Sequence, residues 1–372
     1  MRIVRVEPIV LRLPEVDTTR ADGTQDAFLL RIHTDEGLVG IGEADTSPYL
    51  ARTAIEMPSS HAIARGVGEV LLGLDPLQVD RIWQTLYRAT SYFGRSALAL
   101  HVLSAVDIAL WDIAGKAAGL PVSDLLGGRR VAAVPVYASE VMPETPEEVQ
   151  AIARRAVEDG YGGFKLGWGP LGRDAGLDRE LIVAAREAIG PGRDLMIDGG
   201  QAYSVKSALR LLESVADARL YWFEEPLAPE DVTGYRQLTE RTTVPIAAGE
   251  ADAGVAPFAR LVEDGRIDVL QPDLARCGGF TVARQLRELV RGTGTSIVPH
   301  CFSTGVLVTA SLHFAAALDK PTYSEYSVAS SPFVSRILSR AIELRDGRLD
   351  VPTGPGLGIE LDDERVESLR VA

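Results

Sequence analysis

The strongest constraint on the fold is a repeated pattern in the second half of the chain, in which an apolar run ends in a polar side chain. The residues that end these runs are Asp198, Glu224, Glu250, Asp273, His300 and Glu325. Their residue numbers differ in turn by 26, 26, 23, 27 and 25, the spacing of a strand, a helix and two short loops. The carboxyl ends of parallel strands meet at one face of an α/β fold. The pattern therefore predicts that the six side chains converge on one face of a closed sheet.

Eight strands, separated by segments of helical pattern, are expected in this part of the chain. They are predicted at residues 134–139, 163–166, 195–198, 221–224, 246–250, 269–273, 296–300 and 323–325. Two of the intervening helices begin with capping signals, the Thr-Pro-Glu-Glu sequence at 145–148 and Ser204. This alternation predicts an α/β fold, a (β/α)8 barrel of the triosephosphate isomerase type, over residues 126–340.

The remaining residues predict an added α+β domain over residues 1–125, since a chain of 372 residues exceeds a barrel of about 250. The polar segment 17–26 contains Arg20 and is expected to form a loop, with a mobile lid as one interpretation. Residues 341–372 are expected to fold back onto the first domain. The elements of that domain are predicted at residues 3–13, 27–32, 38–43 and 53–119, with one long helix over 97–118.

The composition disfavours several classes of partner. A net charge of −14 with no basic run argues against nucleic acids and anionic membranes. The two cysteines, Cys277 and Cys301, provide no disulfide framework and favour a reducing compartment. The N-terminus lacks the apolar core of a signal peptide, and no stretch is expected to reach the roughly 20 apolar residues of a membrane span. The sequence therefore predicts a cytoplasmic protein.

Asp198, Glu224 and Glu250 end three successive strands and predict a metal site. One such carboxylate is often only a solvated residue, but three at equal spacing would repel one another unless a divalent cation neutralised them. Oxygen ligands of this kind suit Mg²⁺. Glu225 is expected to point away from the barrel axis, because neighbours on a strand face opposite sides, and to form a structural ion pair.

His300 is the general-base candidate, because the other histidines fall in the first domain or, as His313 does, within a helix. Asp273 ends the preceding strand and is expected to accept a hydrogen bond from the imidazole, which fixes its tautomer. A nucleophilic pair of Cys301 and His300 is disfavoured, since strand neighbours point to opposite faces. Lys165 ends the second strand, where its ammonium group would help to hold a substrate carboxylate, although a surface lysine with a buried stem is the alternative.

Several motifs together resemble the enolase superfamily, in its mandelate racemase subgroup. They are Ala-Val-Asp-Ile-Ala-Leu-Trp-Asp-Ile-Ala-Gly-Lys at 105–116, Leu-Leu-Gly-Gly at 125–128, Phe-Glu-Glu-Pro at 223–226, Gln-Pro-Asp at 271–273 with Gly278-Gly279, and Val-Pro-His at 298–300. The resemblance covers essentially the whole chain. It implies a capping domain over a modified barrel, an essential Mg²⁺ on the three carboxylates, and a homo-oligomer. It also implies that the His300–Asp273 dyad removes the proton α to a carboxylate, with Glu325 hydrogen-bonded to that carboxylate.

Two departures from the family pattern bear on the reaction. The subgroup often has Lys-x-Lys on the second barrel strand, where this chain reads Lys165-Leu166-Gly167. The strand that usually ends Asp-x-Asn reads Asp198-Gly199-Gly200. Racemisation needs acid–base groups on both faces of the carbanion, and Gly167 removes one of them. A single-base reaction is therefore favoured.

The leading hypothesis is a Mg²⁺-dependent dehydratase that converts a sugar acid, an aldonate or aldarate, to a 2-keto-3-deoxy acid. A sugar-lactone cycloisomerase is the first alternative. A racemase or epimerase is the second, with Lys165 or a residue of 168–173 as the other base. A ligand-binding or regulatory protein on an inactive barrel is the third. Substrate contacts are expected from Arg20, which could meet a second carboxylate, from Tyr49, Tyr92 and Trp168, and from Arg276, which could instead meet another subunit.

Overall fold

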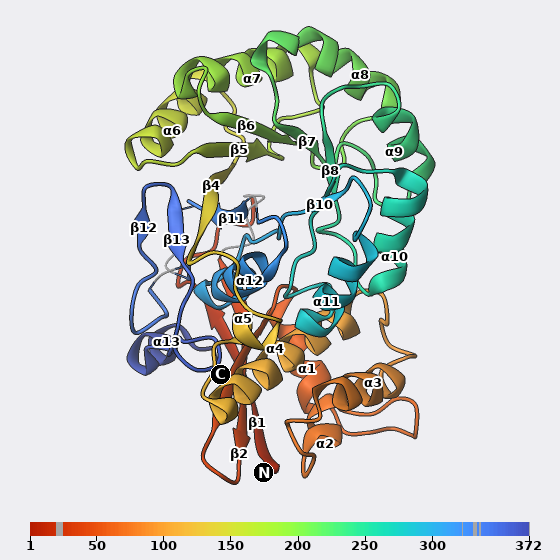
Figure 1. The fold of residues 1–372 in the computed structure, drawn as a ribbon, viewed down its shortest axis with the longest axis vertical. Coiled ribbons are helices and arrows are strands. Elements are labelled where there is room, and N and C mark those ends of the chain that lie inside the picture. Colours follow the sequence, from red (N-terminus) through yellow and green to blue (C-terminus); the bar gives the residue numbers. More distant parts are fainter. Residues whose placement is uncertain (20–24, 322, 330–332, 335, 372) are drawn as a thin grey trace.

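The computed structural model describes residues 1–19, 25–321, 323–329, 333–334 and 336–371 (Figure 1). Figure 1 shows an N-terminal sheet with its helices at one end of the molecule and a wheel of strands and helices at the other. Arg20, a predicted substrate contact, lies outside the described residues. The remaining predicted site residues are described.

The N-terminal part holds a three-stranded antiparallel sheet in the order β1-β2-β3. The predicted hairpin is confirmed, because β2 pairs antiparallel with β3 through a turn that contains Gly37 at a φ of +83°. The elements of this part are β1 (Ile3–Arg12), β2 (Asp26–Thr34), β3 (Val39–Ala44), α1 (Pro48–Glu56), α2 (Val67–Leu71), α3 (Val79–Ala89), α4 (Leu98–Ala118) and α5 (Val122–Leu125).

Helix α4 is apolar on nearly all sides because it lies between the N-terminal sheet and the barrel. Gly42 of β3 allows the two elements to touch, since a β-carbon there would lie 1.9 Å from the carbonyl oxygen of Ala105. Gly119 ends the helix in the left-handed conformation, at a φ of +69°. By length and composition α4 could cross a membrane, which corrects the expectation that no stretch is long enough. However, 83% of its apolar window is buried within the protein, as in the core helix of a folded domain.

The predicted barrel is confirmed, and all eight expected strands are present. They are β4 (Ala133–Val141), β5 (Gly163–Gly167), β6 (Asp194–Asp198), β7 (Trp222–Glu224), β8 (Ile246–Ala248), β9 (Val269–Leu270), β10 (Ser296–Ile297) and β11 (Ser324–Ser327). Strands β4 to β10 pair in sequence order and parallel, and β11 pairs parallel with β4. The Glu325 amide donates to the carbonyl of Pro299 at 3.4 Å, which joins β11 to the end of β10 and closes the sheet.

In the described part of the chain, seven α-helices follow the barrel strands, and Figure 1 shows helices around the outside of the barrel. Both predicted capping signals are confirmed: Thr145 accepts from the backbone of Glu148, and Ser204 accepts from that of Ser207. The helices are α6 (Pro146–Glu158), α7 (Ala175–Ile189), α8 (Val205–Ser214), α9 (Val232–Thr239), α10 (Val255–Arg260), α11 (Gly279–Leu289) and α12 (Gly305–Ala317). The barrel interior beneath the strand ends is filled by Tyr137, Met196, Trp222, Ala247, Val269 and Val298.

The C-terminal part contacts both the barrel and the N-terminal sheet. The hairpin of β12 (Leu344–Arg345) and β13 (Arg348–Asp350) pairs antiparallel with β4. Helix α13 (Asp363–Leu369) packs on β1, and the amide of Val371 donates to the carbonyl of Val10 at 2.9 Å. Among the described residues no barrel helix follows β11, so the barrel is a modified one.

Candidate active site

A cavity of about 330 Å³ lies at the carboxyl ends of the barrel strands. Its walls include Lys165, Asp198, Glu250, His300 and Glu325, which were predicted from the strand spacing. Trp168 and Arg276, two predicted substrate contacts, also line it. The N-terminal part contributes Asp45, so the cavity lies between the two parts of the chain.

The three predicted metal ligands come together at the ends of β6, β7 and β8. Oxygen atoms of Asp198, Glu224 and Glu250 lie within 4.8 Å of one another, and all three residues are buried. Alternation places Met196 and Trp222 beneath the first two, facing the barrel interior. Burial, followed by the charge of Glu224, raises the pKa of Asp198 well above its usual value. Three buried carboxylates at this separation form an oxygen donor set that fits a divalent cation.

Glu250 adds a second indication that the donor set fits a cation. Its Oε2 is buried and accepts no hydrogen bond of good geometry, although the Nε2 of His300 lies 3.0 Å away at ion-pair distance. A buried carboxylate oxygen without a hydrogen bond is costly and is usually explained by an ion or another ligand.

Glu224 is the most tightly held of the three carboxylates. Its Oε2 accepts from the indole of Trp222 at 2.9 Å and from the amide of Gln271 at 2.7 Å, while Oε1 accepts from Lys165. Gln271 was not predicted as a site residue, although it belongs to the Gln-Pro-Asp motif. These contacts fix the direction of the carboxylate in advance of any ligand.

Lys165 lies among carboxylates at the base of the cavity. Besides Glu224, it pairs with Glu325 Oε1 at 2.8 Å and approaches Asp198 Oδ2 at 3.9 Å. Burial lowers the pKa of Lys165, but the charges of Glu224 and Glu325 outweigh it and raise the pKa well above the usual value. Lys165 is therefore a buried, charged ammonium group within the site.

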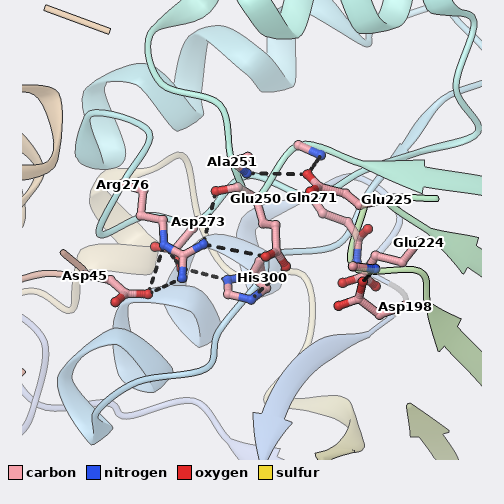
Figure 2. Close-up of polar contacts among 12 residues, drawn as sticks. Asp45, Asp198, Glu224, Glu225, Glu250, Ala251, Gln271, Asp273, Arg276 and His300 are labelled. Atoms are coloured by element: carbon pink, nitrogen blue, oxygen red, sulfur yellow. Dashed lines mark hydrogen bonds and ion pairs between the residues drawn. The ribbon is translucent and has the colours of Figure 1, made fainter. Parts of the chain in front are cut away.

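The predicted dyad is present. His300 Nδ1 lies 2.8 Å from Asp273 Oδ2, and the two residues form a parallel bridge that continues the β9–β10 pairing. Asp273 Oδ1 accepts from the amide of Ala275 at 2.7 Å, which holds the carboxylate in place. A carboxylate at Nδ1 keeps the proton on that nitrogen and leaves Nε2 toward the cavity. Figure 2 shows His300 between Asp273 and Glu250.

Glu325 on β11 completes the ring of strand-end side chains. Its Oε2 accepts from the backbone amide of Cys301 at 2.8 Å, and its Oε1 faces Lys165. The thiol of Cys301 is fully buried, and burial raises its pKa well above the usual value, which agrees with the expectation that it is no nucleophile.

Position 167 is closed by its neighbour. A β-carbon on Gly167 would lie 2.3 Å from the β-carbon of Asp198. Trp168 follows in the left-handed conformation at a φ of +59°, and its indole N–H donates to Asp198 Oδ2 at 3.0 Å. Its ring also lies 3.2 Å from where a β-carbon on Gly200 would be. The glycines at 167 and 200 therefore make room for the contact between Trp168 and Asp198.

Arg276 is bound within the chain. Its guanidinium donates to Asp45 Oδ2 at 2.9 Å and to the Glu250 carbonyl at 3.3 Å, and lies 3.8 Å from Asp273 Oδ2 (Figure 2). Burial lowers its pKa, but the carboxylates of Asp45 and Asp273 outweigh this and raise it. Asp45 was missed by the sequence analysis, because no local motif marks a residue whose partner is 231 positions away.

Three side chains differ from what was expected of them. Tyr49 does not line the cavity; its half-exposed ring lies on α1, with the guanidinium of Arg52 5.5 Å from the ring centre. Tyr92 is exposed. The ion pair expected for Glu225 is not formed with any described residue. Its carboxylate instead accepts from the Gln201 side chain at 2.8 Å and the Gly249 amide at 3.2 Å.

Comparison with known proteins gives matches over both parts of the chain. Residues 1–127 match the model of the mandelate racemase/muconate lactonizing enzyme N-terminal domain, and residues 148–365 match that of the enolase C-terminal domain-like family. The chain is 34% identical to D-galactarolactone cycloisomerase of Agrobacterium fabrum, over 92% of this chain and 91% of that one. It is 32% identical to D-galactonate dehydratase of Variovorax paradoxus, over 91% and 90%. The crystal structure of 3,6-anhydro-D-galactonate cycloisomerase from Zobellia galactanivorans superposes with a TM-score of 0.91 at 31% identity, covering all of both chains.

Proposed function

The chain belongs to the mandelate racemase/muconate lactonizing enzyme family of the enolase superfamily, and on that premise we propose that it is a Mg²⁺-dependent dehydratase of a sugar acid. The observation that carries this proposal is a single imidazole–carboxylate dyad beside three buried carboxylates, with the position of a second base closed. The substrate class is an aldonate or aldarate, and the product is a 2-keto-3-deoxy acid.

Asp198, Glu224 and Glu250 would hold the cation. When bound there, Mg²⁺ would offset the negative charge that develops on the substrate carboxylate as the α-proton leaves. Lys165 and Glu325 form an ion pair at 2.8 Å in the cavity wall, where the ammonium group would bind an oxygen of the substrate carboxylate. Burial raises the pKa of Glu325, but the charges of Lys165 and His300 outweigh it and lower the pKa, so Glu325 would hold the ammonium group in place.

His300 carries the proton transfers. Its Nε2 takes the proton from the α-carbon, and the bond electrons form a carbon–carbon double bond as the β-hydroxyl leaves. The proton on Nε2 then passes to the departing hydroxide, which leaves as water. Asp273 stabilises the imidazolium between the two steps through Nδ1–H. The enol so formed tautomerises to the keto acid, and the imidazole is again neutral.

The closure of position 167 favours this one-base course over racemisation. A racemase needs a second acid–base group on the opposite face of the carbanion, and a lysine at position 167 would collide with Asp198. The ammonium group of Lys165 is already engaged by Glu224 and Glu325, so it is poorly placed to remove a proton.

A second function, that of a sugar-lactone cycloisomerase, is supported by the relative from Agrobacterium fabrum and by the superposition on the Zobellia galactanivorans enzyme. The same dyad would remove the α-proton, and the group expelled from the β-carbon would be a ring oxygen instead of hydroxide. The two functions therefore differ in the leaving group and share the base.

The test is a library of sugar acids and the corresponding lactones, assayed for 2-keto acid with Mg²⁺ and after its removal with a chelator. A dehydratase forms keto acid from an open-chain acid only when Mg²⁺ is present, and the His300→Asn variant does not. Product from lactones alone would assign the cycloisomerase. Absence of keto product from the whole library would overturn both.

A further inference from the structure

Glu43 is a fully buried carboxylate of the N-terminal sheet that binds the start of a barrel helix. It is the penultimate residue of β3, and it has no exposed surface. Its Oε1 accepts from the Thr304 amide at 3.1 Å, and its Oε2 accepts from the Thr304 hydroxyl at 2.6 Å and the Leu307 amide at 2.7 Å. Thr304 is the N-cap of α12. The carboxylate therefore satisfies free amides of the first helical turn from a different part of the chain.

A buried carboxylate is costly unless its hydrogen bonds are made. Burial raises the pKa of Glu43 to about 7, against the opposing effect of its bonds to Ser303 and Thr304. An apolar side chain would avoid this cost but would leave the amides of Thr304 and Leu307 without their partner. Packing of the sheet against the barrel would not by itself require a buried carboxylate here, so the hydrogen bonds to Thr304 and Leu307 are what this residue provides.

The segment that Glu43 holds carries the general base. It runs from the end of β10 to the start of α12, and it contains His300 at one end and Thr304 at the other. His300 is bound to Asp273, and the amide of Cys301 donates to Glu325 at 2.8 Å. Phe302 lines the cavity. The barrel thus fixes the first half of the segment, and the N-terminal sheet fixes the second half.

The same end of β3 also holds the segment that carries Asp273. Two residues beyond Glu43, Asp45 binds Arg276 (Figure 2). The amide of Asp45 also donates to the carbonyl of Ala275 at 3.3 Å. Both members of the dyad therefore lie on loops that are bound by the end of β3, one by Glu43 within the strand and the other by Asp45 just beyond it.

We propose that Glu43 is a positioning residue for the general base: it holds the His300–Thr304 segment from the N-terminal sheet and so maintains the alignment of His300 with Asp273. Glu43 touches neither the cavity nor the dyad, so its effect is exerted through Thr304 and the first turn of α12. The inference rests on the proposed function where it is tested by kcat, but not where it is tested by hydrogen exchange.

Glu43→Gln is the main test because it keeps the size of the side chain and changes one acceptor into a donor. In either orientation the amide NH₂ faces an N–H donor, the amide of Thr304 or that of Leu307. We expect kcat to fall by about 10- to 100-fold, since small displacements of a catalytic group have effects of this size, while KM changes by less than about twofold. Should this variant fail to fold, Thr304→Val serves the same test, because it removes the hydroxyl that donates to Glu43 Oε2 and accepts from the Val306 amide at the start of α12.

Asp112→Asn is the matched control. Asp112 is an equally buried carboxylate of α4 that also holds β3, through the amide of Ile41 at 2.9 Å, but it contacts neither loop of the dyad. Both variants change one buried carboxylate next to β3. Asp112 also pairs with Lys116 at 2.7 Å and accepts from the Leu357 amide at 2.8 Å, so its substitution is the harsher disturbance of β3. We expect the control to keep kcat within about twofold of the parent. An equal loss of kcat in both variants would overturn the proposal, because it would reflect disturbance of β3 in general.

Hydrogen exchange measured by mass spectrometry gives a readout that needs no substrate. In Glu43→Gln the amides of residues 301–307 should exchange about tenfold faster, whereas Asp112→Asn should leave them unchanged. If the parent protein turns over no sugar acid, the proposed function fails and this measurement alone decides the inference. Unchanged exchange at 301–307, or faster exchange with an unchanged kcat, would contradict the role of Glu43.

Discussion

Asp198 occupies the space that a side chain at position 167 would need. A β-carbon on Gly167 would lie 2.3 Å from the β-carbon of Asp198 and 2.9 Å from its carboxyl carbon, far inside the separation of about 3.5–4.0 Å at which carbon atoms attract one another. Position 167 therefore does not simply lack the second lysine of the Lys-x-Lys pattern. Asp198 on the adjacent strand fills the space that a side chain there would occupy.

Gly167→Ala is expected to push Asp198 out of the carboxylate triad and to weaken Mg²⁺ binding by about tenfold. Isothermal titration of the purified variant with Mg²⁺ measures this. Gly162→Ala is the matched control, since a β-carbon there meets only the Tyr323 hydroxyl at 3.7 Å, an ordinary contact. Equal affinities for Mg²⁺ in the two variants would show that β5 and β6 can move apart without displacing the Asp198 carboxylate.

Trp168→Phe tests the indole N–H separately from the aromatic wall. The variant keeps a ring beside Gly200 and loses only the hydrogen bond to Asp198 Oδ2, which is 3.0 Å long. Loss of a partner that orients a metal ligand should raise the Kd for Mg²⁺ by about tenfold. Titration with Mg²⁺ again provides the measurement. An affinity equal to that of the parent would mean that the Gly200 amide, which donates to Asp198 Oδ1 at 2.9 Å, is enough to orient the carboxylate.

His300→Asn is expected to lower kcat by about 10²- to 10⁴-fold. The carboxylate triad should still bind Mg²⁺, because His300 transfers protons and is not a metal ligand. Exchange of the substrate α-hydrogen in deuterated water, followed by proton NMR, reports the removal of the α-proton directly. The parent should label the α-carbon or the product derived from it, and the variant should not. Labelling at an undiminished rate in His300→Asn would assign the base elsewhere.

Asp107 predicts a dependence of stability on pH. Burial raises its pKa from 3.8 to about 7, although its carboxylate accepts a 3.0 Å hydrogen bond from the Thr281 amide. Between these values the folded chain retains a proton that the unfolded chain releases. The free energy of unfolding should therefore fall by about 1.4 kcal/mol per pH unit as pH rises through this window.

Asp107→Asn should remove this contribution, so that the free energy of unfolding of the variant falls less steeply with pH, by about 1.4 kcal/mol per pH unit. Urea unfolding of parent and variant at several values between about pH 5 and about pH 7 provides the comparison. Parallel profiles would mean that Asp107 does not hold a proton in the folded state.

Sequence periodicity predicted the barrel and the residues at its strand ends, because parallel strands bring their carboxyl ends to one edge. Asp198, Glu224 and Glu250 meet for this reason. For Glu225, the expectation that it is not a metal ligand agrees with its place outside the carboxylate triad, but the expected ion pair is not formed with any described residue. Its φ of +29° bends the chain immediately after β7, so strict alternation no longer determines its neighbours. Its carboxylate is bound by Gln201 and backbone amides instead of a cation.

Residues supplied by the N-terminal sheet could not be found in this way. Asp45 and Glu43 acquire their roles from partners more than 200 positions away, and neither lies in a pattern that marks a site. Trp168 was predicted as a wall of the cavity, but its bond to Asp198 depends on the left-handed backbone at 168. Contacts of this kind follow from the packed structure and leave no periodic signal.

The attachment of β3 to both dyad loops means that the barrel is not an autonomous catalyst. A fragment that lacks the N-terminal sheet would retain the metal-binding side chains, yet the amides of Thr304 and Leu307 and the guanidinium of Arg276 would lose their acceptors. Cavity side chains that make none of these contacts could therefore differ between relatives while the proton-transfer residues stay anchored.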